Sequence, residues 1–162
     1  MKQRSAVTVL VVEDDANDVL LLKRAFRKAG TEPFPVIHVV NDGESAVRYL
    51  GGVGEFGDRR SHPLPDLVLL DLKLPRMSGH EVLAWRSEQL PLIRIPVIVM
   101  SSSQEASDIA RAYDCGANSY LVKPVELEVL VEIIGALQGY WLRFNETAAV
   151  TEPRTFGTRL AT

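Results

Sequence analysis

The sequence predicts an α/β protein in which helices cover both faces of a parallel β-sheet. Short apolar segments alternate five times with longer segments whose apolar residues recur at helical spacing. Val68, Leu69 and Leu70 are apolar at consecutive positions, as is typical of a strand buried on both faces. A repeated strand–helix unit of this kind requires parallel strands joined by right-handed crossovers.

Five short strands are expected, each ending in polar residues or in a turn. They lie at residues 7–12, 36–40, 66–70, 96–100 and 119–122. Their alternation with helices predicts a flavodoxin-like, doubly wound sheet with the strand order 2-1-3-4-5.

Five helices are expected between and after these strands, at residues 17–29, 42–49, 78–89, 104–114 and 126–144. Gly30 can end the first helix in a left-handed conformation, and Asp42 can cap the second. Ser78 or Gly79 begins the third, which ends before Pro91.

Two segments are expected outside the compact unit. Residues 51–65 contain four glycines and form a loop that is long for this architecture. Residues 145–162 have no apolar period, which predicts a disordered tail. The chain is therefore expected to hold one domain, at residues 1–144, and no second folded domain.

Composition narrows the classes of function. The 162 residues carry a net charge of −3, and the pI is near 5.6, which argues against a nucleic-acid surface. Cys115 is the single cysteine, so no disulfide is expected within one chain. Met1 to Ser5 are polar, and no apolar run approaches the roughly 20 residues that span a bilayer. We expect a cytoplasmic protein without a signal peptide or a membrane segment.

Reactive side chains follow four of the predicted strands. Glu13 and Asp14 come after the first strand and Asp71 after the third, while Ser101 and Lys123 follow the fourth and fifth. Because ligands of open α/β sheets bind outside the carboxyl ends of the strands, we expect these side chains to form one site.

The residue types in this site indicate phosphoryl chemistry. Crowded carboxylates repel one another and need a cation to stay ionised. With oxygen ligands and no cluster of histidines or cysteines, Mg²⁺ is the best fit. A lysine and a hydroxyl beside the metal suit a phosphoryl group. The site is therefore interpreted as a phosphoryl-accepting aspartate, Asp71, with the metal and Lys123 neutralising charge.

Simpler roles are expected for several neighbouring residues. Asp15 and Asp18 are interpreted as residues that favour the start of a helix. Ser103 is interpreted as a helix cap. Arg59 and Arg60 are interpreted as a solvated pair in a loop, with contact to a kinase as the alternative. The three histidines are scattered and are expected to pack or face solvent: His38, His62 and His80.

Four motifs together resemble the receiver domain of two-component response regulators. They lie, in order, at residues 11–14, 70–79, 96–101 and 116–124. The resemblance covers residues 7 to about 144 and is greatest to single-domain regulators paired with phytochrome-type histidine kinases. Residues 41–44, the glycine-rich stretch after Leu50 and the aromatic end of the last helix support this narrower resemblance.

The resemblance implies a role for each site residue. Asp71 would accept the phosphoryl group, and Mg²⁺ would be bound by Glu13, Asp14, Asp71 and the backbone carbonyl of Lys73. Glu13 stands where the family commonly has aspartate. Lys73 puts a cation where the family tunes the attacking water, which leaves the lifetime of the phosphoryl group open.

The resemblance also implies a conformational switch. Ser101 would move to the phosphoryl group, Lys123 would pair with it, and Tyr120 would change rotamer. The Lys123–Pro124 peptide bond would be cis. The protein would act by changed protein–protein contacts after phosphorylation by a sensor histidine kinase, and would not be a turnover enzyme on an external substrate.

Two other classes of function require sequence features that this chain lacks. A phosphohydrolase with an aspartyl-phosphate intermediate usually has a second acid two residues after its nucleophile, where this chain has Lys73. A flavin or nucleotide binder needs a glycine-rich phosphate loop after the first strand, where this chain has Glu13, Asp14 and Asp15, which would repel a phosphate that has no metal beside it.

The last predicted helix carries two apolar stripes, although docking on a sheet requires one. The second stripe either packs on a neighbouring helix or forms an interface with another protein, and we favour a homodimer interface. The aromatic residues of this interface would be Tyr140, Trp141 and Phe144.

Overall fold

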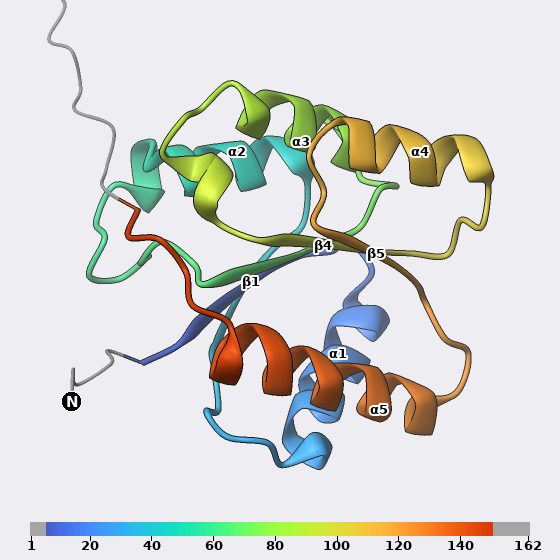
Figure 1. The fold of residues 1–162 in the computed structure, drawn as a ribbon. Helices are drawn as coiled ribbons and strands as arrows, with labels where there is room; N and C mark the ends of the chain where they lie inside the picture. The colour runs from blue at the N-terminus through green and yellow to red at the C-terminus, as the bar shows by residue number, and fades with distance from the viewer. Residues whose placement is uncertain (1–5, 151–162) are drawn as a thin grey trace, which may run out of the picture.

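The computed structural model describes residues 6–150 as a five-stranded parallel sheet between two layers of helices (Figure 1). The strand order is β2-β1-β3-β4-β5, so the predicted flavodoxin-like topology is confirmed. The strands are β1 (Thr8–Val12), β2 (Val36–Val40), β3 (Leu67–Leu70), β4 (Val97–Ser101) and β5 (Ser119–Val122).

Helices α1 and α5 cover one face of the sheet, and α2, α3 and α4 cover the other (Figure 1). The five α-helices are α1 (Ala16–Ala29), α2 (Gly43–Gly51), α3 (Gly79–Ser87), α4 (Ala106–Asp114) and α5 (Leu127–Leu137). Short 3₁₀ turns, η1 (Gly54–Phe56) and η2 (Leu92–Arg94), lie in the connections before β3 and β4.

The helix ends follow the signals in the sequence. Asp42 caps α2 through the backbone N–H of Ser45, and Ser78 forms a capping box with Glu81 at the start of α3. Gly30 ends α1 with a φ of 61°, a left-handed conformation that glycine adopts without steric cost.

The central strands are buried on both faces, as the apolar run in β3 predicts. Val68 and Leu70 pack beneath α2 and α3, whereas Leu67 and Leu69 pack toward α1 and α5. Successive side chains of a strand point to opposite faces, so one apolar run supplies both cores.

The chain after β5 differs from the single long helix that was predicted over 126–144. Helix α5 ends at Leu137 and continues as a π-helix, η3 (Gln138–Phe144). The wider turn of a π-helix changes which residues face the core. Leu142 is buried there, Trp141 is partly buried, and Phe144 is exposed.

The long loop before β3 is held by side-chain contacts. Arg59 donates hydrogen bonds to the carbonyl oxygens of Tyr49 (2.7 Å) and Leu50 (2.8 Å), near the end of α2. The interpretation of Arg59 as a solvated loop residue was wrong, because these carbonyls at a helix end need donors. The rings of His38 and His62 pack on Tyr49, as expected of histidines with packing roles.

The segment after η3 is not detached from the domain as far as the structure describes it. Arg94 Nη1 donates a hydrogen bond to the carbonyl oxygen of Ala149 at 3.0 Å, and Val150 packs against the core beneath α2 and α3. Residues 145–150 thus contact the domain, and the rest of the predicted disordered tail, 151–162, lies outside the described residues. Between residues 6 and 150, no helix combines the length and apolar character that crossing a membrane requires.

Candidate functional site

The predicted site residues meet at the carboxyl edge of the sheet. Glu13 directly follows β1, Asp71 follows β3, Ser101 is the last residue of β4, and Lys123 follows β5. Backbone hydrogen bonds between the strands fix the positions of these residues along the sheet. The N–H of Asp71 donates to the carbonyl oxygen of Val12 at 3.1 Å. The N–H of Lys123 bonds to the carbonyl of Ser101 at 2.8 Å. Parallel strand pairing therefore places these residues side by side.

The Lys123 ammonium is the centre of the site. Its Nζ donates hydrogen bonds to Glu13 Oε2 at 2.7 Å, to Asp18 Oδ2 at 2.8 Å and to Asp71 Oδ2 at 2.9 Å. Glu13 and Asp71 are nearly fully buried, at 3% and 7% exposure. Three charge-assisted hydrogen bonds hold the ammonium in one position.

Asp71 is held on both of its oxygens. Oδ1 accepts a hydrogen bond from the backbone N–H of Leu72 at 2.7 Å and a longer one from that of Lys73 at 3.4 Å, while Oδ2 faces Lys123. The first residue of α3, Gly79, packs against the backbone of Asp71 and Leu72. A Cβ on Gly79 would stand 2.3 Å from the Asp71 carbonyl oxygen, so the close approach requires glycine.

Burial and charge shift the pKa values of two groups. Burial raises the pKa of Glu13 from 4.5 to about 7, against the lowering effect of its hydrogen bond with Lys123. Burial alone would lower the pKa of Lys123, but hydrogen bonds to Asp18, Glu13 and Asp71 outweigh it and raise that pKa. The lysine therefore stays charged, while Glu13 can exchange a proton near neutral pH.

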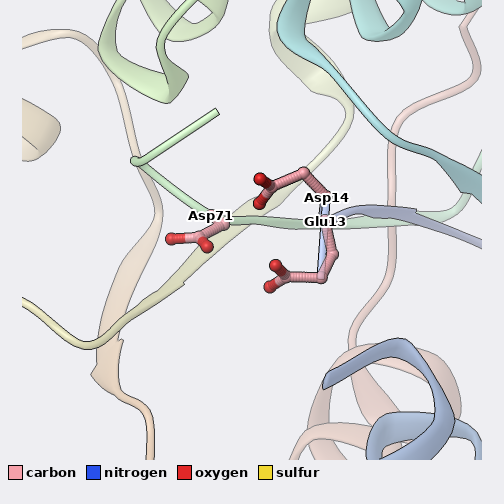
Figure 2. A group of neighbouring side chains, drawn as sticks. All are labelled: Glu13, Asp14 and Asp71. Carbon is pink, nitrogen blue, oxygen red and sulfur yellow. The ribbon is translucent and has the colours of Figure 1, made fainter. Parts of the chain in front are cut away.

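Three carboxylates at this edge fit a divalent cation. One carboxylate oxygen each from Glu13, Asp14 and Asp71 lie within 4.8 Å of one another, and Asp14 is exposed. Figure 2 shows the three side chains pointing into the same space. An all-oxygen set with an open side suits Mg²⁺ or Mn²⁺, which keep several water ligands.

Comparison with known proteins identifies the family. Residues 9–135 match the family described as the response regulator receiver domain. The chain belongs to this family.

Three relatives are similar over most of their length. The chain is 39% identical over 139 residues to the probable methanogenesis regulatory protein FilR2 of Methanothrix harundinacea, covering 86% of each chain. It is 34% identical to the response regulator Rcp1 of Synechocystis, covering 83% of this chain and 88% of Rcp1. A crystal structure of Rcp1 in its Mn²⁺-bound form superposes with a TM-score of 0.78 at 31% identity, covering 88% of this chain and 99% of that one.

The third relative is the phosphorylated cyanobacterial phytochrome response regulator RcpA. Its crystal structure superposes with a TM-score of 0.82 at 34% identity, covering 90% of this chain and all of RcpA. The receiver domain therefore resembles single-domain, phytochrome-associated regulators, as the motifs predicted.

The residues predicted to form the switch of this receiver are linked to one another. Ser101 is fully buried, and its Oγ accepts a hydrogen bond from the backbone N–H of Ser103 at 3.3 Å. The Tyr120 hydroxyl donates to the carbonyl of Ser103 at 2.9 Å. The Ser103 hydroxyl donates a hydrogen bond to Asp108 Oδ2 at 2.5 Å and accepts one from the backbone N–H of Glu105. Because Asp108 lies in α4, Ser103 connects the site to that helix.

The expectation of a cis Lys123–Pro124 bond was wrong. The cis peptide bond among residues 6–150 is Glu32–Pro33. The trans form of an X–Pro bond is the intrinsically preferred one, and the position of the Lys123 ammonium is reached with it.

Sequence reasoning missed Asp18 as a member of the site. It was interpreted only as a residue at the start of a helix, and its side chain instead contacts Lys123. No local pattern indicated this contact, because Asp14 lies before α1 and Lys123 is 105 positions away from Asp18 along the chain. Asp15, by contrast, has the predicted role, because its side chain caps α1.

Proposed function

We propose that the protein is a response regulator that accepts a phosphoryl group on Asp71 from a sensor histidine kinase. The observation that carries the proposal is the Asp71 carboxylate, held 2.9 Å from Lys123 beside two further carboxylates that can share a cation. A nucleophilic carboxylate, a fixed ammonium and a metal-binding group are what phosphoryl transfer to aspartate requires.

In the proposed reaction, a carboxylate oxygen of Asp71 attacks the phosphorus of a kinase phosphohistidine. The new O–P bond forms as the P–N bond breaks, and the electron pair leaves with the histidine nitrogen. A proton carried on the other ring nitrogen of the phosphohistidine makes the leaving group neutral imidazole. Lys123 turns one of its hydrogen bonds from Asp71 to a phosphoryl oxygen. Mg²⁺, held by Glu13, Asp14, Asp71 and the Lys73 carbonyl, would supply the positive charge that offsets that of the phosphoryl oxygens.

The hydrogen-bonded chain from Ser101 supports a route for signalling. In the proposal, the Ser101 hydroxyl turns to donate to a phosphoryl oxygen and gives up its contact with the N–H of Ser103. Tyr120 is anchored on the carbonyl of the same residue, so it can change rotamer when Ser103 moves. The surface of α4, β5 and α5 would then bind a partner differently.

The proposed donor is a phytochrome-type histidine kinase. This rests on likeness to RcpA and on the motifs of the sequence. Receiver domains receive their phosphoryl group from kinases, so the proposal places the protein in the cytoplasm, as a phosphoacceptor with at most self-dephosphorylation. A gene for such a kinase beside this one would support the pairing.

Replacing Asp71 by asparagine is expected to abolish labelling by acetyl phosphate. Asparagine has nearly the same size but lacks the nucleophilic carboxylate. Intact mass after incubation with Mg²⁺ should show one phosphoryl group on the wild type and none on Asp71→Asn, and a chelator should prevent the labelling. Asp66 is a matched control, since it also lies beside β3 but accepts the backbone N–H of Thr8. If Asp66→Asn were unlabelled and Asp71→Asn labelled, the assignment would be wrong.

We also propose a homodimer through the end of the chain's last helical segment. Tyr140 and Phe144 are 56% and 68% exposed on η3, which is unusual for aromatic residues. Trp141 packs partly against the core, so only the exposed part of its side chain could contact a partner. Replacing Tyr140 and Phe144 by serine should lower the sedimentation coefficient from that of a dimer to that of a monomer, with an unchanged circular dichroism spectrum. A dimer in both forms, or a monomer in both, would end this proposal.

A further inference from the structure

Asp18 lies in the first turn of α1, but its side chain does not cap the helix. Its Oδ2 accepts a hydrogen bond from Lys123 Nζ at 2.8 Å. The cap is Asp15, whose Oδ1 accepts the backbone N–H groups of Asn17 and Asp18. The Asp18 carboxylate is therefore not needed to begin α1, and its position reflects the contact with Lys123.

The three N–H donors of the Lys123 ammonium are all used by carboxylates. Two of these, Glu13 and Asp71, also belong to the group that can hold a cation, whereas Asp18 does not. A cation would bind Glu13 and Asp71, and the phosphoryl group would become bonded to an oxygen of Asp71, so both events would weaken the contacts of Lys123 with these two carboxylates. Asp18 would remain available to the ammonium throughout.

The surroundings of Lys123 offer little else to hold it on that side. Its side chain borders a cavity of about 50 Å³ whose lining includes the apolar residues Leu22, Met100 and Leu130. Asp18 also lines this cavity, and its side chain is 36% exposed, whereas those of Glu13 and Asp71 are buried. Asp18 is therefore the solvent-accessible one of the three carboxylates that contact the ammonium.

We propose that Asp18 is a positioning residue for Lys123. It holds the ammonium directed at Asp71 while the cation binds Glu13 and Asp71 and the phosphoryl group is bonded to Asp71. It touches no reacting atom, so its effect is on the geometry and charge of Lys123 alone. The inference rests on the proposed function, because it assigns Asp18 a part in the same reaction.

The test is the rate of Asp71 labelling by acetyl phosphate over a range of Mg²⁺ concentrations. For Asp18→Asn we expect the maximal rate to fall about tenfold, which corresponds to one weakened charge-assisted hydrogen bond. The half-saturating Mg²⁺ concentration should change less than about twofold, because Asp18 is not a ligand. Asp18→Glu, which restores a carboxylate, should recover most of the rate.

The matched control is Glu126→Gln, which removes one negative charge from an N-cap residue whose side chain makes no capping hydrogen bond. It should label as the wild type does. Thermal denaturation checks the fold of each variant, and Asp18→Ser gives the same comparison if the asparagine variant is unstable.

Three results would overturn the inference. They are a maximal rate equal to or above that of the wild type, an effect confined to the half-saturating Mg²⁺ concentration, and no recovery with glutamate. Failure of the proposed function looks different, because the wild type itself would then remain unlabelled.

Discussion

Replacement of Lys123 by alanine is expected to slow the phosphorylation of Asp71 at least about a hundredfold at saturating Mg²⁺. The ammonium is the one side-chain cation that contacts Asp71 among the described hydrogen bonds and ion pairs, and it is positioned before the reaction begins. Its loss removes a fixed donor from the place where the phosphoryl oxygens would lie. Intact mass against time of incubation with acetyl phosphate measures the change.

The same substitution is expected to destabilise the metal-free protein by about 2 kcal/mol at pH 8. It leaves Glu13 and Asp71 buried without their shared partner, so that they either repel each other or take up a proton, and both cost stability at pH 8. Mg²⁺ should restore part of this stability by replacing the missing positive charge. Urea denaturation with and without Mg²⁺ tests both statements.

Lys23→Ala is the control for Lys123→Ala, since Lys23 is an exposed lysine within α1. It removes the same charge from the chain without touching the site. Equal labelling rates and equal stabilities for the two variants would show that Lys123 has no special role.

Glu13 is expected to make the metal-free protein less stable as the pH rises toward neutrality. Burial, above all, raises its pKa from 4.5 to about 7 in the folded chain. Between these values the folded chain keeps a proton that the unfolded chain releases. The contribution of Glu13 is therefore fully present below pH 4.5 and is lost as the pH rises through about 7, by on the order of 3 kcal/mol.

Glu13→Gln isolates this contribution, because glutamine keeps the shape of the side chain but cannot titrate. His38 is present in both proteins and would complicate either stability curve taken by itself. Burial lowers its pKa, so its contribution makes the folded chain more stable as the pH rises toward 6.5. The quantity to measure is the difference in unfolding free energy between wild type and variant from pH 4.5 to pH 8. That difference should fall with rising pH, and a constant difference would contradict the buried, protonatable state of Glu13.

Much of the site could be predicted because it depends on backbone rules. A parallel sheet places the residues after each strand at one edge, so Asp71, Ser101 and Lys123 meet whatever the loops between them do. The bounds of β2 and β5 agree with those expected from the sequence, since their apolar residues are flanked by turn or cap residues. The caps Asp15, Asp42 and Ser78 have a local mechanism and were predictable for the same reason.

Features that depend on packing between distant segments were not predictable. Arg86 was unremarked in the sequence but is buried, and it donates hydrogen bonds to the carbonyls of Gly116, Ile93 and Ile95. Its partners come from two other segments, so no local pattern indicates them. Asp18 is similar, because its role depends on where the fifth strand delivers Lys123.

The end of the last helix shows another limit of periodicity. A period of 3.6 residues places Trp141 on the stripe of Leu130 and Ile134. Trp141 does pack partly against their core, but the π-helix buries Leu142 more deeply. A π-helix has no distinct sequence signal and is recognised by its hydrogen bonds. The predicted apolar stripes were therefore right within α5 and shifted by one residue beyond it.

The measurement that tests the account most directly is the site of the phosphoryl group. After incubation with Mg²⁺ and acetyl phosphate, borohydride reduction converts an aspartyl phosphate to homoserine, which marks the modified residue. Tryptic peptides are then sequenced by mass spectrometry, and cleavage after Arg60 and Lys73 isolates residues 61–73, with Asp66 and Asp71. The account predicts homoserine at position 71 alone. Homoserine at position 14 or 66, or a stable phosphate on a histidine with Asp71 unmodified, would contradict it.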